Sequence, residues 1–238
     1  MVPDATTPIA GDGRRTLPPA LVALTVVSGF LDAVSYLGLG HVFTANMTGN
    51  VVVIGFAAVG TSGFSVVGSL LSLAAFLAGA VLAGRTEARL RGRGRARWVR
   101  AVVTAEAVLL AAGTGLAFTC DAATVTDLLI VLMALAMGLR NGTVRKLAVP
   151  DLTTTVLTLT LTGLASESSL AGGDNPRAGR RLGSVAAMLA GAAAGATLVN
   201  RVGLGWPLLV STVLVGATAL WYRDAGAGTG AGAAAGAS

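Results

Sequence analysis

The sequence is poor in the residues from which most catalytic and metal sites are built. Its 238 residues include one cysteine, Cys120, and one histidine, His41. A single cysteine excludes an intramolecular disulfide, and the two residues together cannot form a cysteine/histidine metal cluster within one chain. No Walker-type phosphate loop is present either. We therefore expect no enzyme, no catalytic residues, no cofactor and no bound metal.

Charged residues are scarce as well. They make up 12% of the chain against 54% hydrophobic residues, and the mean hydropathy is +0.77. A soluble domain of this length is not so apolar, so most of the chain must lie in a lipid bilayer. The net charge of +6 would suggest nucleic acid in a soluble protein. Here the arginines lie between long apolar runs, where they orient a membrane protein, and we expect no nucleic-acid partner.

The apolar runs and their breaks predict an all-α, polytopic membrane helix bundle. Residues 1–18 are expected to be a mobile leader, and residues 19–223 a single transmembrane domain. Residues 224–238 are almost all alanine, glycine, serine and threonine and are expected to be disordered. Threonine at every second position of residues 158–162 is typical of a strand, but an open strand cannot lie in lipid, so we expect helix there too.

Two short segments, residues 44–60 and 153–165, decide how many times the chain crosses the bilayer. Seven arginines against one glutamate in residues 85–100 place that loop in the cytoplasm. If both segments cross, there are eight spans and six arginines fall outside: Arg14, Arg15, Arg177, Arg180, Arg181 and Arg223. If both dip in and return, six full spans remain and only Arg201 is misplaced, with Arg140 set aside as intramembrane. The charges favour six spans with both termini cytoplasmic; seven or eight full spans are the alternative.

An internal repeat agrees with six spans. When the first half is shifted along the chain so that Gly29 falls on Gly138, Asp32 falls on Asn141 and Thr44 on Thr153. The halves, about 19–118 and 125–223, then have three spans each and opposite orientations, an arrangement that recurs in transporters and channels. The alternative is two unrelated pairs of glycine-containing helices. Two ridges of small residues are expected to be close helix contacts: Ala75, Gly79 and Ala83, and Gly183, Ala187, Gly191 and Gly195.

Polar residues inside the apolar runs mark the candidate site. In lipid each would cost a few kcal/mol, so such residues face a bundle interior or a water-filled cavity. Their oxygens, with the amides at helix N-termini, could coordinate a small ion or polar solute. The alternative is that they only hydrogen-bond neighbouring helices. The candidate substrate- or ion-binding residues are Asp32, Asn46, Thr48, Asn50, Arg140, Asn141, Thr153, Thr154 and Thr155.

Asp32 and Arg140 are the two charges expected deepest in the membrane. Asp32 lies about 18 Å along the first span, and Arg140 lies at a comparable depth in the repeat-related helix. An unpaired charge at that depth is costly, so we expect the two to share one polar core. Glu106 is the rival partner for Arg140.

Four stretches resemble a known family: Gly29–Tyr36, Phe43–Asn50, Gly138–Asn141 and Val149–Thr158. They are similar to the motifs of the YoaK-like (DUF1275) family of bacterial inner-membrane proteins, and the resemblance covers about Leu17 to Tyr222. It implies a multi-pass protein of the bacterial inner (plasma) membrane whose activity is unassigned.

The sequence thus favours a transporter or permease for a small solute or ion, with its polar site at the two broken segments. The alternative, from another class, is a non-transporting membrane scaffold or accessory subunit. The expected partners are the lipid bilayer and an unidentified small solute or ion, and a second copy of the chain is a further candidate.

Overall fold

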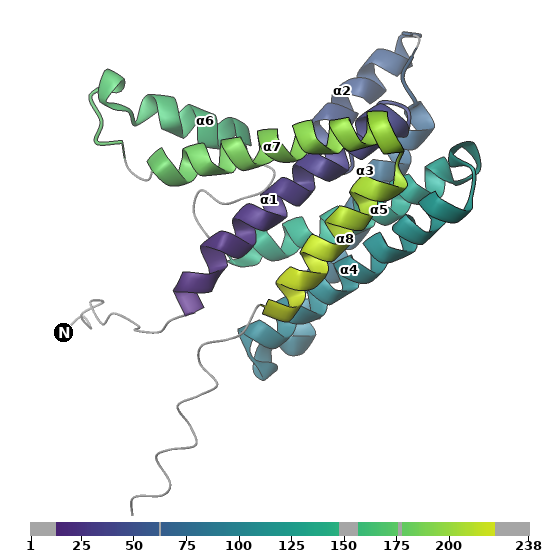
Figure 1. Cartoon of the computed structure of the whole chain (residues 1–238). Coiled ribbons are helices and arrows are strands. Elements are labelled where there is room, and N and C mark those ends of the chain that lie inside the picture. The colour runs from purple at the N-terminus through teal and green to yellow at the C-terminus, as the bar shows by residue number, and fades with distance from the viewer. Residues whose placement is uncertain (1–12, 62, 148–156, 176–177, 222–238) are drawn as a thin grey trace, which may run out of the picture.

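The computed structural model describes residues 13–61, 63–147, 157–175 and 178–221, and within them every regular element is a helix (Figure 1). The predicted all-α membrane bundle is confirmed. The tail, residues 224–238, and the first part of the expected leader, residues 1–12, lie outside the described residues. The helices are α1 (Gly13–Gly38), α2 (Met47–Ala58), α3 (Val66–Leu90), η1 (Arg91–Arg93), α4 (Arg95–Thr119), α5 (Ala122–Leu147), α6 (Leu157–Ser166), η2 (Ser169–Ala171), α7 (Ala178–Val202) and α8 (Gly205–Trp221).

Helix length separates six long helices from two short ones. Four helices, α3, α4, α5 and α7, are long and apolar enough to cross a membrane. Helix α1 has 26 residues and α8 has 17, or about 39 and 25 Å. Helices α2 and α6 have 12 and 10 residues, or about 18 and 15 Å, against a hydrocarbon core of about 30 Å. To cross the bilayer fully, α2 would have to be about twice as long.

Left-handed backbone at two turns sets the bounds of α2. Gly40 and His41, with φ of +84° and +61°, follow the end of α1 and reverse the chain. Gly60, with φ of +83°, follows the end of α2, where its amide donates to the carbonyl of Ala57. Glycine adopts this backbone without strain. The chain therefore turns back after α1 and again after a helix of only three turns.

The helices pack as an inverted repeat (Figure 1). Helix α1 of the first half packs along α7 of the second, and α5 of the second half packs along α3 of the first. Helix α4 lies against α8, α2 lies on α3, and α6 lies on α7. Each of these contacts has its counterpart when the halves are exchanged. The structure thus has the predicted repeat, with three long helices and one short helix in each half.

Close backbone contacts make the repeat visible at single residues. A Cβ atom on Gly79 of α3 would meet the carbonyl oxygen of Leu135 on α5, and one on Gly191 of α7 would meet that of Val26 on α1. The shift that places Gly29 on Gly138 also places Val26 on Leu135. The same contact therefore forms twice with the halves exchanged, because only glycine lets two helix backbones approach so closely.

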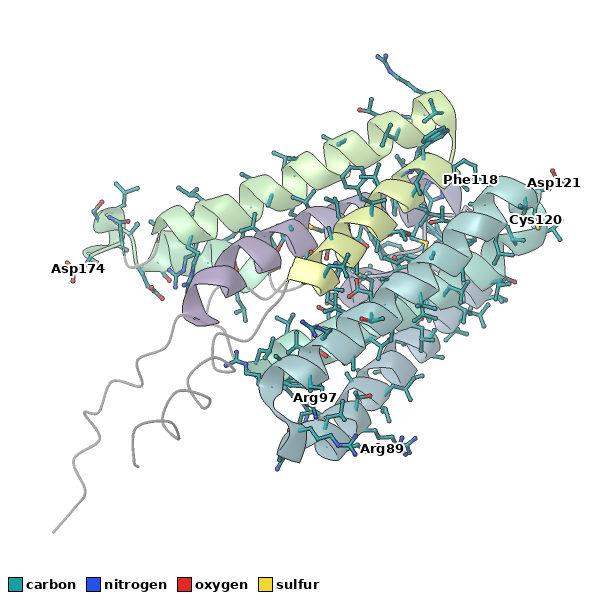
Figure 2. All side chains as sticks on the ribbon, turned by 60° about the horizontal axis from the view of Figure 1, so that its bottom comes forward. Arg89, Arg97, Phe118, Cys120, Asp121 and Asp174 are labelled. Carbon is teal, nitrogen blue, oxygen red and sulfur yellow. The ribbon has the colours of Figure 1, made fainter. Side chains whose placement is uncertain are left out.

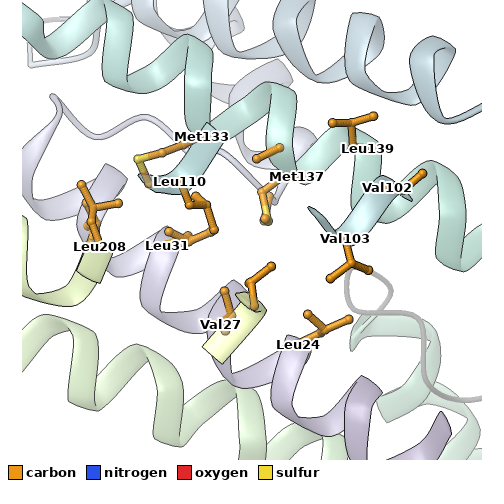
Figure 3. Close-up of a cluster of buried hydrophobic side chains, with 14 of the residues drawn as sticks. Leu24, Val27, Leu31, Val102, Val103, Leu110, Met133, Met137, Leu139 and Leu208 are labelled. Atoms are coloured by element: carbon orange, nitrogen blue, oxygen red, sulfur yellow. The ribbon is translucent and has the colours of Figure 1, made fainter. Parts of the chain in front are cut away.

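The centre of the bundle is filled by α1, α4, α5 and α8. Figure 3 shows side chains from all four helices meeting there, with Leu31 of α1, Leu110 of α4, Met133 of α5 and Leu208 of α8 among them. None of these four is more than 1% exposed. Helices α3 and α7 flank this core and expose leucines such as Leu77 and Leu189 to the surroundings. The expected bundle is thus packed at its centre and apolar on its outside.

The two ends of the bundle differ in charge. Figure 2 places Arg89 and Arg97 at one end, and Phe118, Cys120 and Asp121 at the other. At the arginine end Lys146 of α5 pairs with Glu87 of α3 at 2.8 Å. This separation agrees with the charge count that favoured six spans.

The ridge of α3 is a helix contact as predicted, but that of α7 is only partly one. Ala187, Gly191 and Gly195 are buried, whereas Gly183 is exposed and a Cβ there would meet nothing within 4 Å. A strict four-residue spacing drifts by about 40° per step around a 3.6-residue helix. The buried face instead continues through Ser184, so the prediction was wrong for Gly183.

We expect Gly191→Leu to destabilise the folded protein, because its side chain would have to displace the backbone of α1 at Val26. Overpacking of this kind costs about 1–3 kcal/mol. Gly183→Leu is the matched control on the same helix. Thermal unfolding in detergent and the folded yield measure the effect, and equal values for the two variants would show that α1 and α7 do not pack closely there.

Candidate functional site

The chain after α1 turns back into the bundle before α2 begins. The amide of Ala45 donates to Oδ1 of Asp32 at 3.1 Å, and the amide of Thr44 also donates to this carboxylate. Asp32 lies six residues before the end of α1, or about 9 Å below it. Residues 39–46 therefore re-enter the bundle by almost two helical turns, and α2 leads the chain out again.

Asn50 holds the same re-entrant loop from the other side. Its Oδ1 accepts the amide of Phe43 at 2.9 Å, and its Nδ2 donates to the carbonyl of Phe43 at 2.6 Å. Ser72 of α3 donates to that carbonyl as well, at 2.6 Å. Asn50 and Ser72 are fully buried. Because unpaired peptide groups are costly at membrane depth, Asp32 and Asn50 serve here to satisfy and position the loop.

A charged residue holds the second short helix. Arg181 of α7 is buried and donates to Oε2 of Glu167 at 2.9 Å. Its guanidinium lies under Gly163 of α6, where a Cβ atom would be 3.1 Å from Cζ. Helix α6 is therefore fixed to α7 by an ion pair, whereas α2 is fixed to α3 by neutral hydrogen bonds.

A cavity of about 460 Å³ lies between α2 and the N-terminal end of α6. Its polar lining consists of Asn46 and Thr48 from the first half and Thr158 from the second. The rest of the lining is aromatic, aliphatic or glycine: Tyr36, Phe43, Phe56, Phe64, Val52, Val53 and Gly49. Side chains of both halves thus meet in one cavity.

The three polar residues of the cavity differ from the buried ones in that their side chains form no hydrogen bond within the described part of the chain. The side chain of Asn46 forms no capping hydrogen bond with α2, and within the described residues neither Thr48 nor Thr158 has a side-chain hydrogen bond. Thr48 is the second residue of α2, and Thr158 is the second described residue of α6. Each half therefore contributes a hydroxyl to the cavity, and that of Thr48 lies beside the N-terminus of α2, where free amides favour acceptors and anions.

Arg140 pairs with Glu106 and not with Asp32, so the expected pairing was wrong. Nη2 of Arg140 donates to Oε1 of Glu106, and Nη1 donates to the carbonyl of Leu24 at 2.7 Å and to Oγ of Ser28 at 3.1 Å. Arg140 is 2% exposed and Glu106 0%. Helix α5 packs along α4, which carries Glu106, and the carboxylate of Asp32 is already occupied by the loop. The ion pair joins α1, α4 and α5 in the interior.

Only part of the predicted site comes together. Asn46 and Thr48 line the cavity; Asp32, Asn50, Arg140 and Asn141 do not, and residues 153–155, the three candidate threonines, lie outside the described residues. In the described part of the chain, no three histidine, cysteine, aspartate or glutamate side chains are grouped to hold a metal.

The prediction missed Thr158 and the aromatic residues. The shift that aligns Thr44 with Thr153 aligns Thr48 with Leu157. A shift larger by one residue would have aligned Thr48 with Thr158. The aromatic signal was also present, because only 11 of 238 residues are phenylalanine, tyrosine or tryptophan. Four of them fall in residues 36–64 and line this one cavity.

We expect Glu106→Gln and Arg140→Gln each to lower the free energy of unfolding by about 3–5 kcal/mol, since each leaves a buried charge without its partner. The double variant should lose clearly less than the sum of the two. Chemical unfolding in detergent measures all three. As a control, Asp32→Asn combined with Arg140→Gln should be additive within about 0.5 kcal/mol; strong coupling there and none at Glu106 would contradict the pairing.

Comparison with known proteins agrees with this architecture. A model of the family described as "Protein of unknown function (DUF1275)" matches residues 20–221. The chain is similar to the UPF0700 transmembrane protein YoaK of Bacillus subtilis (strain 168), with 37% identity over 163 residues that cover 66% of this chain and 68% of that protein. No solved structure matches significantly. The chain therefore belongs to the DUF1275 family and is a multi-pass membrane protein related to YoaK.

Proposed function

We propose that this protein is a permease for a small polar solute or ion, and that the cavity between α2 and α6 is its binding site. One observation carries the proposal: polar side chains of both repeat halves line a single cavity beside the N-terminus of the short helix α2. Short helices of opposite orientation that end at such a site are a recurrent feature of transporters.

The free hydroxyl and amide groups of the cavity favour a permease over a scaffold. In a bundle whose polar residues serve only to join helices, those residues satisfy one another, as Asn50 and Ser72 do. Asn46, Thr48 and Thr158 have no such partners within the described residues. At membrane depth an unsatisfied polar group costs free energy unless water or a solute meets it. A polar solute that passes through would supply these hydrogen bonds.

The same proposal places the protein in the bacterial inner membrane with its arginine-rich end in the cytoplasm. The turn between α3 and α4 and the helix ends beside it hold the largest group of arginines in the chain. Positive charge near the ends of spans favours the cytoplasmic side. The turn between α4 and α5, with Cys120 and Asp121, then faces outward.

The transport function can be tested by filling the cavity. Thr158 lines it, whereas the next residue, Leu159, is 69% exposed on the outside of the bundle. We expect Thr158→Trp to abolish any difference in uptake or efflux that untargeted metabolite analysis finds between deletion and overexpression strains. Leu159→Trp adds the same bulk and should retain it. If the two variants transport equally well, or if no solute differs between the strains, the permease proposal fails.

The single cysteine offers a direct test of orientation. Cys120 is exposed at the end opposite to Arg89 and Arg97 (Figure 2). We expect a membrane-impermeant maleimide to label it in intact cells. In a Cys120→Ser background, Gly92→Cys should be labelled only after the cells are opened, because Gly92 lies in the exposed turn between α3 and α4. The reverse pattern would invert the proposed topology.

A further inference from the structure

We infer that the cavity between α2 and α6 selects an uncharged, planar ring compound that carries a carbonyl or amide group. The inference rests on the proposed function, because it names the class of solute for the same site. It is drawn from three properties of the cavity: its aromatic wall, the absence of charged side chains among its described lining residues, and the position of its free polar groups.

One wall of the cavity is continuously aromatic. The rings of Tyr36 and Phe43 lie 4.8 Å apart, and those of Phe56 and Phe64 lie 5.7 Å apart. His41 connects the two pairs, with its ring 5.0 Å from Tyr36 and 6.5 Å from Phe64. Flat ring faces bind planar ligands through stacked or edge-to-face contacts. A flat ring compound fits this wall better than a branched or spherical solute.

No charged side chain lines the cavity within the described part of the chain. The nearby carboxylate of Asp32 is occupied by the loop amides, and Arg140 is occupied by Glu106. A charged solute would therefore meet no counter-charge among the described lining residues. A cation would also face the N-terminus of α2, which is partially positive, and an anion would face the electron-rich ring faces. The cavity disfavours both charge types.

The polar groups of the cavity come from the start of α2 and from α6. Asn46, Thr48 and Thr158 provide donors and acceptors there, and the first amides of α2 have no partner within their helix. A carbonyl or amide at the edge of a flat ring can bind these groups while the ring lies on the aromatic wall. A cavity of about 460 Å³ is within the range of small-molecule sites.

A set of probes with the same shape and different charge tests the inference directly. Benzamide is neutral, benzoate is its anionic counterpart and benzamidine its cationic one, while cyclohexanecarboxamide keeps the amide and replaces the flat ring. Binding to the purified protein in detergent can be measured by saturation-transfer NMR and titration calorimetry. We expect benzamide to bind at least tenfold more tightly than each of the other three.

Variants locate the binding in the cavity. Thr48→Val and Thr158→Val should each weaken benzamide binding about fivefold, since each removes one hydrogen bond. Thr197→Val is the matched control, because Thr197 is exposed on α7 and bonds only its own helix at Ala193. No benzamide binding, equal or tighter binding of a charged probe or of cyclohexanecarboxamide, or an equal effect of all three variants would overturn the inference.

Flux measurements separate this inference from the function on which it rests. Benzamide that binds in the cavity but does not cross the membrane of proteoliposomes would support the class of ligand and overturn the permease. Transport of a solute that Thr158→Trp blocks, without any binding of benzamide, would support the permease and overturn the class of ligand.

Discussion

The structure depends on the hydrogen bonds that allow the chain to turn back inside the bundle. At membrane depth no bulk water is available to satisfy peptide groups, so a non-helical loop needs partners from the protein. Asp32 supplies them from α1, and Asn50 supplies them from α2, where its amide satisfies both the N–H and the C=O of Phe43. With the loop fixed in this way, α2 begins inside the bundle, and the cavity exists beside its first turn.

The six long helices form the frame against which this loop is held. Glycines at repeat-related positions allow the backbones of α1 and α7, and those of α3 and α5, to come into direct contact. Helices α4 and α8 complete the packed interior. Such contacts rely on close packing, because lipid gives little hydrophobic drive for helices to associate. The short helices α2 and α6 lie at the sides of this frame, against α3 and α7.

Much of this could be predicted from sequence, for reasons that differ between features. The arginines of residues 85–100 indicated the topology, because the positive-inside rule needs only the charges in the loops beside each span. Gly29 and Gly138 indicated the repeat, because close contacts require glycine at equivalent positions. The partner of Arg140 could not be read in this way, because it depends on which helix faces α5. Thr158 was missed because the offset between equivalent residues of the two halves increases along the chain. The offset that aligns Gly29 with Gly138 aligns Thr48 with Leu157, one residue before Thr158.

The ion pair between Arg140 and Glu106 makes the two halves chemically different. When Gly29 is placed on Gly138, the residue that falls on Arg140 is Leu31, which is fully buried in the core. A symmetric assembly of two identical half-length chains would carry this pair twice or not at all. The pair is therefore a feature in which the two halves of this chain differ. Any two conformations that simply exchange the shapes of the halves then differ in free energy, so one of them is the resting state.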